Sequence, residues 1–315
     1  DASRAAELAS SLQPLWQGRG LLREGLSWFD AILAHADFDA VPPAVRARAL
    51  ADRAVLDSYL SAADGMEQAQ EAVETARALE DPALLARALT ACGCLCGFDV
   101  DAAAPYFAEA IGLARQTGDD WLLSKILARQ AYGAAMIGEP DLAAAYGSEG
   151  SAIAEAVGDW SSAHLCGWAL GMATMMRAEL HDSVEQFAAA RARAEADHDV
   201  ISMLVCLVSQ GLTLCNLGEM SAARAVADEA IRAGAQLGPL AEGAATTILA
   251  MAALAEGDSA SAWQTSSAAW RDPSFQRGTV AAGLVALSAL AVGDVGAAQE
   301  LADLAVATLA GVHKM

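Results

Sequence analysis

The chain has 315 residues, with 19 lysines and arginines against 40 aspartates and glutamates, so its formal net charge is −21. A negative charge of this size repels phosphate backbones and anionic lipid, which argues against direct nucleic-acid binding and against attachment to a membrane surface. Aromatic residues make up only 5% of the chain, and no run of alternating Val, Ile and Thr occurs, so the composition predicts an all-α fold.

The N-terminal region predicts two helix pairs of less regular form. Residues 4–17 pair with 21–35, and residues 43–63 pair with 66–79. Between the pairs, residues 36–42 form the only long loop that we expect, and nothing resembles a flexible linker. No signal peptide opens the chain, and the lack of an initiator Met favours a segment of a longer protein.

A regular repeat begins after residue 80, and its clearest copy runs from Gly118 to Trp160. Asp119 is placed to start a helix by accepting hydrogen bonds from free backbone N–H groups. Gly138 can take the left-handed conformation that ends this helix. Pro140 suits the first turn of a second helix, which ends at Gly158. One unit is therefore a hairpin of two antiparallel helices.

The same landmarks recur about every 40 residues. Turns within the pairs are marked by Gly97, Gly138, Ala178, Gly218, Gly257 and Gly293, and a small residue follows each turn at Ala102, Ala143, Ser183, Ala223, Ala262 and Ala298. Small residues at this position let the two helices of a hairpin cross closely. The spacing predicts a right-handed α-solenoid of about eight hairpins, a single repeat domain over 1–315 that is less regular over 1–80 and regular over 81–310.

Three long uncharged segments, 160–176, 200–218 and 278–293, each precede a charged one. The second is as long as a membrane-spanning helix. The alternation favours a different interpretation, in which one helix of each pair is packed on all sides by its neighbours. We therefore expect no membrane span.

The opening sequence is LWQGRGLLREGLSWFDAIL, with Trp16, Gly20, Glu24, Gly25 and Trp28 as its landmarks. Together with the 40-residue hairpins, it resembles the tetratricopeptide-repeat region of bacterial, especially actinobacterial, signalling ATPase and LuxR-type transcriptional regulators. The resemblance implies a sensor or scaffold segment, flanked in the full-length protein by an ATPase and a helix-turn-helix domain. The chain itself has no G-x-x-x-x-G-K-[ST] phosphate loop.

The resemblance also implies a concave groove, built by the first helix of each pair. Counting back from the turn residues places these side chains in it: Arg87, Cys94, Lys125, Arg129, Tyr132, Met136, Trp168, Met172, Met175, Thr247 and Met251. Such a lining is mainly apolar with a few cations, and it fits an amphipathic small molecule with an acidic head or an apolar helix of another protein. The alternative is that Lys125 and Arg129 balance neighbouring acids on an exposed face.

His164 stands between Trp160 and Trp168 at helical spacing. In one interpretation the three form the wall of an apolar ligand site, with His164 as its polar contact. In the other they are ordinary core between stacked hairpins.

The six cysteines, Cys92, Cys94, Cys96, Cys166, Cys206 and Cys215, fall in predicted helices and not in a disulfide framework. We expect reduced thiols and a cytoplasmic protein. No His or fourth thiol completes a zinc site around Cys92–Cys96. Asp119-Asp120 lacks the third acid of a metal-diphosphate motif, so the sequence predicts no metal and no cofactor.

Three functions are compatible with this architecture. The first is a non-catalytic sensor or interaction domain of a regulator. The second is a structural protein–protein scaffold without a small-molecule site. The third, an α/α-toroid enzyme, needs paired acids or metal ligands on the inner helices, and these helices are nearly uncharged. The sequence therefore predicts a protein that is not an enzyme.

Overall fold

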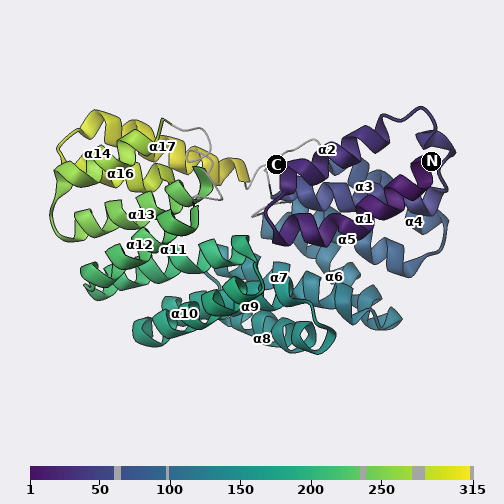
Figure 1. The fold of residues 1–315 in the computed structure, drawn as a ribbon, viewed down its shortest axis with the longest axis horizontal. Helices are drawn as coiled ribbons and strands as arrows, with labels where there is room; N and C mark the ends of the chain where they lie inside the picture. The colour runs from purple at the N-terminus through teal and green to yellow at the C-terminus, as the bar shows by residue number, and fades with distance from the viewer. Residues whose placement is uncertain (60–64, 97–98, 235–238, 272–280, 313–315) are drawn as a thin grey trace. The chain divides into compact units, whose positions relative to one another are not determined.

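The computed structural model describes residues 1–59, 65–96, 99–234, 239–271 and 281–312. These residues form sixteen α-helices and one 3₁₀ helix and contain no strand, which confirms the all-α prediction. The helices form antiparallel pairs: α1 (Ala2–Gly18) with α2 (Leu22–Leu33), α3 (Pro43–Ser58) with α4 (Met66–Ala78), α5 (Pro82–Leu95) with α6 (Val100–Thr117), α7 (Asp120–Met136) with α8 (Pro140–Val157), α9 (Trp160–Met176) with α10 (Leu180–Ala196), α11 (Val200–Leu217) with α12 (Met220–Gly234), α13 (Pro239–Ala255) with α14 (Ser259–Ala269), and α16 (Ala281–Ala291) with α17 (Val295–Val312) (Figure 1).

The chain divides into two compact units. Unit 1 comprises residues 1–170 and 194–201, and unit 2 comprises residues 171–193 and 202–315. Within unit 1, α1 packs on α3, α3 on α5 and α5 on α7, so the first helices of successive pairs are neighbours. The organisation of residues 1–315 as one continuous repeat domain stays a prediction.

The predicted turn residues end their helices as expected. Gly138, Gly218 and Gly257 have φ of 83°, 82° and 78°, a region that glycine enters without steric cost. Ala178 occupies the same position in its hairpin with φ of 62° although it carries a Cβ atom. Gly293 has φ of 84°, and Gly97, the first of the six predicted turn residues, lies outside the described residues. Asp119 caps α7 as predicted, its side chain accepting a hydrogen bond of 2.9 Å from the N–H of Leu122.

The predicted small residues lie where paired helices cross, with one exception. Ala143, Ser183, Ala223 and Ala262 are fully buried, and Ala298 is also buried. Ala102 is only half-buried, and its neighbour Ala103 takes the buried position. The prediction was wrong at this turn because the N-cap of α6 is Asp99, two residues after Gly97. The buried small residue lies four positions after the N-cap, and it is therefore Ala103 and not Ala102.

Close helix contacts also depend on glycines within the helices. A Cβ atom on Gly93 would lie 2.8 Å from the Phe107 ring, and one on Gly171 would lie 2.7 Å from the Phe187 ring. Gly25 has the same relation to the Trp16 ring, at 2.8 Å. Trp16 and Gly25, two landmarks of the opening sequence, therefore pack on each other, and this close contact explains why the second of them is a glycine.

Ion pairs join the second helices of neighbouring hairpins. Arg77 of α4 lies 3.0 Å from Glu109 of α6, and Arg115 of α6 lies 2.6 Å from Glu149 of α8. Arg191 of α10 lies 2.6 Å from Glu229 of α12. Exposed pairs of this kind stabilise a fold by at most about 1 kcal/mol each, so they fix the register of neighbouring hairpins more than they add stability.

Helix α11 is long and apolar enough to cross a membrane by length and composition alone, and 56% of it is buried inside the protein.

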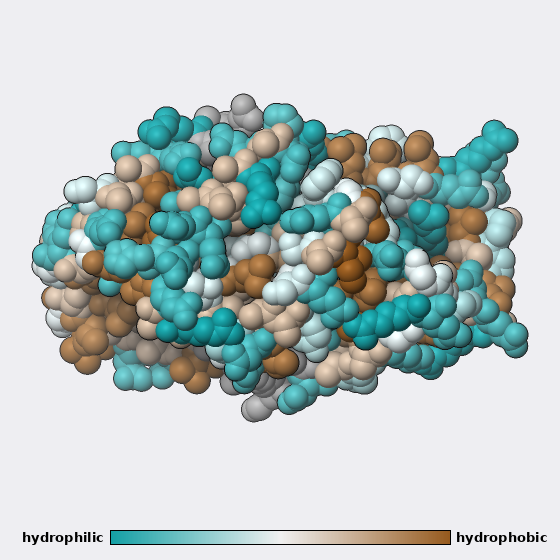
Figure 2. All heavy atoms as spheres, turned by 90° about the horizontal axis from the view of Figure 1, so that it is seen from below, coloured by the Kyte–Doolittle hydropathy of each residue, from teal (hydrophilic) through white to brown (hydrophobic). Residues whose placement is uncertain are grey.

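The N-terminal loop predicted over 36–42 contains a 3₁₀ helix, η1 (Phe38–Ala40), with Phe38 and Val41 buried. On the face drawn in Figure 2, polar side chains cover much of the surface and the apolar ones form separate patches between them.

Candidate functional site

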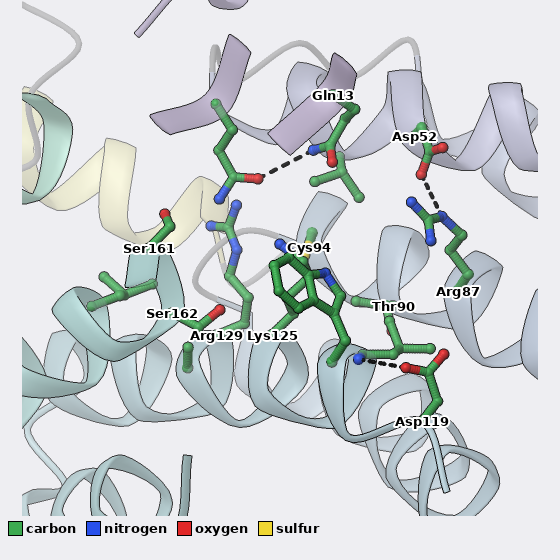
Figure 3. A pocket seen from close by; sticks show the side chains of 16 residues that line it. Gln13, Asp52, Arg87, Thr90, Cys94, Asp119, Lys125, Arg129, Ser161 and Ser162 are labelled. Carbon is green, nitrogen blue, oxygen red and sulfur yellow. Dashed lines mark hydrogen bonds and ion pairs between the residues drawn. The ribbon is translucent and has the colours of Figure 1, made fainter. Parts of the chain in front are cut away.

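The candidate site is a pocket of about 70 Å³ in unit 1. Five helices line it, α1, α3, α5, α7 and α9, and each is the first helix of its pair. The lining comprises Gln13, Gln17, Asp52, Val55, Arg87, Thr90, Cys94, Asp119, Trp121, Leu122, Lys125, Ala128, Arg129, Ser161, Ser162 and Leu165 (Figure 3). Of the groove residues predicted from the sequence, Arg87, Cys94, Lys125 and Arg129 therefore meet in one place.

Arg87 is neutralised by a buried carboxylate. Its Nε donates to Asp52 Oδ1 at 2.6 Å, and Arg48 approaches the other oxygen of Asp52 at 3.7 Å. Asp52 belongs to α3 and Arg87 to α5, so the pair fixes neighbouring hairpins. The charge of Arg87 is accordingly already compensated on one side of the pocket.

Lys125 is held in a mixed polar and aromatic environment. Its Nζ lies 3.7 Å from Asp159 Oδ2 and 5.3 Å from the centre of the Trp121 ring. Burial lowers the pKa of Lys125, and the nearby Asp159 carboxylate opposes this shift. Asp159 also accepts hydrogen bonds from Ser124 Oγ at 3.0 Å and Ser162 Oγ at 2.6 Å, so its charge is shared among three partners.

Arg129 differs from both because no carboxylate in the described part of the chain pairs with it. Its guanidinium stacks on Tyr59, 4.0 Å from the ring centre. Its Nη2 atom is buried and has no hydrogen-bond partner there. Burial raises the pKa of Tyr59 to about 12, and the positive charge of Arg129 opposes this shift. Figure 3 shows the Arg129 side chain leaving α7 toward the helix that carries Gln13.

Amide and hydroxyl groups complete the polar lining. Gln13 Nε2 donates to Gln17 Oε1 at 3.1 Å, and both come from α1. Ser161 and Ser162 belong to the first turn of α9. Cys94 lies among these groups as a free thiol, and burial raises its pKa.

The other predicted groove residues lie outside this pocket, and a role for them in a groove stays a prediction. In unit 1, Tyr132 packs against Trp168, with ring centres 5.1 Å apart, and Trp168 is buried. Met136 is half-buried. In unit 2, Met172 and Met175 are half-buried, Thr247 is buried and bonds to Gly243 O, and Met251 lines a second concavity of about 340 Å³.

His164 is buried between two carboxylates. Its Nε2 lies 3.0 Å from Asp197 and its Nδ1 lies 3.1 Å from Asp199. Both ring nitrogens therefore face carboxylate oxygens. Trp160, by contrast, is 53% exposed. Of the three residues at helical spacing, Trp160 is therefore exposed, whereas His164 and Trp168 are buried.

Among the described residues, no group of three or more His, Cys, Asp or Glu side chains could hold a metal ion. The cysteines there are free thiols, as predicted. Burial raises the pKa of Cys92 to about 12 and that of Cys96 to about 11, which keeps these thiols protonated and poorly nucleophilic at neutral pH.

Solved structures decide the fold. A Rap protein complexed with competence and sporulation factor superposes with a TM-score of 0.67 at 10% identity, covering 99% of both chains. A signal transduction ATPase with numerous domains and a tetratricopeptide repeat sensor, from Pyrococcus horikoshii, gives 0.54 at 13% identity, over 84% of this chain and 41% of that one. The fold is that of a tetratricopeptide-repeat protein. Aspartyl phosphate phosphatase F from Bacillus subtilis shares this fold as well, with a TM-score of 0.60 at 12% identity, over 99% of this chain and 86% of that one.

Sequence comparison places this tetratricopeptide-repeat chain beside transcriptional regulators. It is 42% identical, over 99% of its length, to a protein of Mycobacterium tuberculosis strain H37Rv that is provisionally named an HTH-type transcriptional regulator. A Mycobacterium bovis protein with the same description matches equally well. The chain spans about a third of the length of these relatives, 36%. No protein-family profile matches the chain. The predicted resemblance to the repeat region of bacterial regulators is confirmed.

The polar groups that α1 and α9 bring to the pocket were not predicted from the sequence. Gln13, Gln17, Ser161 and Ser162 lie more than 30 residues from Arg129 in sequence, and they carry no local motif. The repeat gave a usable signal all the same, because every lining helix is the first of its pair.

Proposed function

We propose that the chain is a non-catalytic sensor or interaction domain of a bacterial transcriptional regulator, and that it holds a small amphipathic molecule or a protein segment in the unit 1 pocket. The observation that carries this proposal is the convergence of five first helices on one polar and apolar pocket. Similarity to named regulators over 99% of the chain supports the regulatory context.

The solved neighbours support binding as the role of this architecture. One of them was crystallised in complex with competence and sporulation factor, and another carries its repeats as a sensor. One neighbour is named as a phosphatase, but the pocket lining offers one half-buried thiol of raised pKa, Cys94, and the carboxylates of Asp52 and Asp119, which already engage an arginine and a backbone N–H group. Such groups serve binding better than acid–base or nucleophilic chemistry.

In this proposal the full-length protein adds an ATPase and a helix-turn-helix domain and works in the cytoplasm, and the remaining predicted groove residues extend the binding surface. Filling the pocket would alter how neighbouring hairpins pack, and because each hairpin touches mainly its neighbours, such a change can pass along a repeat array. DNA contact belongs to another part of the regulator in this scheme, because the chain is strongly acidic.

The test fills the pocket with a side chain. Ser161→Trp adds bulk to the lining, whereas Ser11→Trp places the same side chain on the exposed face of α1. We expect Ser161→Trp to change transcription from the target promoters in cells that carry the full-length regulator, and Ser11→Trp to leave it unchanged. Circular dichroism establishes that both variants fold. Equal transcription in both folded variants would favour a scaffold without a small-molecule site.

A further inference from the structure

Three basic side chains line the pocket, and two of them already have carboxylate partners. Asp52 lies 2.6 Å from Arg87, and Asp159 lies 3.7 Å from Lys125. Asp119 also lines the pocket, but its carboxylate caps α7 and lies on the side away from Arg129 (Figure 3). Of these three cations, Arg129 is the one for which the described part of the chain shows no carboxylate partner.

A buried guanidinium nitrogen without an acceptor is costly. Leaving a buried donor unsatisfied costs about 1–3 kcal/mol, and more when the group is charged. Stacking on Tyr59 at 4.0 Å and a side-chain hydrogen bond with the same residue compensate part of the charge, but neither gives Nη2 an acceptor. The Nη2 atom therefore has an empty hydrogen-bonding direction that an oxyanion can fill.

The size of the pocket limits the occupant. A water molecule needs about 10–15 Å³ of such space, so a volume of about 70 Å³ holds a group the size of about five waters. A carboxylate with the first carbons of its chain fits this volume. The apolar lining of Val55, Leu122 and Leu165 suits the chain that follows the head group.

From these observations we infer that the unit 1 pocket receives the carboxylate head of a small amphipathic acid, with Arg129 as its anchor. Lys125 supplies a second cation from the same helix, α7, one turn away. The amide and hydroxyl groups of Gln13, Gln17 and Ser161 border the head group, and the apolar lining borders the tail. This inference rests on the proposed function and narrows it from a molecule or protein segment to one class of small molecule.

The experiment titrates the 315-residue chain with sodium octanoate, followed by calorimetry and by thermal unfolding. We expect binding and a raised melting temperature. Arg129→Gln should weaken binding at least tenfold, because the fork of donors is lost. Arg115→Gln is the matched control, since Arg115 is an exposed arginine in the neighbouring pair, paired with Glu149 outside the pocket, and it should leave binding unchanged. Should Arg129→Gln fail to fold, Arg129→Lys tests the same fork while keeping the charge.

Further ligands test which parts of octanoate, the carboxylate or the apolar tail, the pocket recognises. Octylamine and 1-octanol, which share the tail but lack the anion, should bind much more weakly than octanoate. Acetate binding as tightly as octanoate would assign the site to free carboxylates and overturn the amphipathic part of the inference. Inorganic phosphate that binds through Arg129 when octanoate does not would overturn the carboxylate assignment.

Absence of octanoate binding, or equal binding by Arg129→Gln, overturns the inference as a whole. Neither result touches the proposed function, which the transcription experiment with Ser161→Trp tests separately. A chain that binds no octanoate but loses regulation when the pocket is filled has the proposed function with another class of ligand.

Discussion

At the scale of single residues, Ala178 is an alanine in a turn position that otherwise carries glycine in the described hairpins at Gly138, Gly218, Gly257 and Gly293. The sequence predicted a turn at this residue from its spacing alone, and the structure places it in the left-handed region with φ of 62°. Glycine takes that conformation freely, whereas a side chain with a Cβ atom is strained there. The turn position is thus dictated by the hairpin and not by the residue that occupies it.

We therefore predict that Ala178→Gly stabilises the protein. Removing the Cβ atom relieves left-handed strain of about 1 kcal/mol, partly offset by the greater freedom of glycine in the unfolded chain, so the expected gain is about 0.5 kcal/mol. Urea denaturation measures it. Gly138→Ala makes the reverse change in α7's turn, where φ is 83° and a Cβ atom would meet nothing within 4 Å. It should lower stability, and a gain in that variant would contradict the argument.

His164 makes a second residue-scale prediction possible. Replacing it with Phe removes the contacts to Asp197 and Asp199. The Asp199 carboxylate is buried and loses its imidazole partner, whereas the Asp197 side chain is 41% exposed. Removing the hydrogen-bond partner of a buried polar group typically costs about 1–3 kcal/mol, so thermal unfolding should occur at a clearly lower temperature. His181→Phe is the control because His181 is exposed. An equal effect of the two changes would show that the contacts of His164 with Asp197 and Asp199 do not contribute to stability.

At the scale of helices, the hairpins were predictable and their close contacts were only partly so. Glycine and aspartate at the helix ends act locally, which is why α7, α8 and their turns followed from the sequence. The site residues depend on contacts between hairpins. Arg87, Lys125 and Arg129 could be placed by counting within repeats, but the pairing of Arg87 with Asp52 across 35 residues could not. The missed register at Ala102 has the same origin, since one extra turn residue has no local signature.

Close packing at glycine gives a prediction for the helices themselves. Gly93→Ala should destabilise the protein by about 1–3 kcal/mol, since the new methyl would sit 2.8 Å from the Phe107 ring. Gly133→Ala is the matched change on α7, where a Cβ atom meets nothing within 4 Å. It should stabilise the helix by about 0.5–1 kcal/mol, because alanine loses less backbone entropy than glycine. Opposite signs in urea denaturation would support the packing argument, and a shared sign would refute it.

At the scale of the whole molecule, contacts concentrate within two units, and the carboxylate site lies entirely in unit 1. A ligand that binds only the folded form stabilises it by RT ln(1 + [L]/Kd), which is about 2.7 kcal/mol at a hundredfold excess over Kd. In a repeat protein, stability is approximately a sum over units and their neighbours, so this gain need not reach the whole chain.

We therefore predict that saturating octanoate shifts the unfolding of unit 1 more than that of unit 2. Hydrogen exchange under mild urea resolves the two, because α5 and α7 report on unit 1 while α13 and α16 report on unit 2. Exchange should slow in α5 and α7 and change little in α13 and α16. Arg129→Gln should abolish the slowing, whereas Arg115→Gln should retain it. Uniform slowing along the chain would instead mean that the units unfold as one, and that filling the pocket is transmitted to every hairpin.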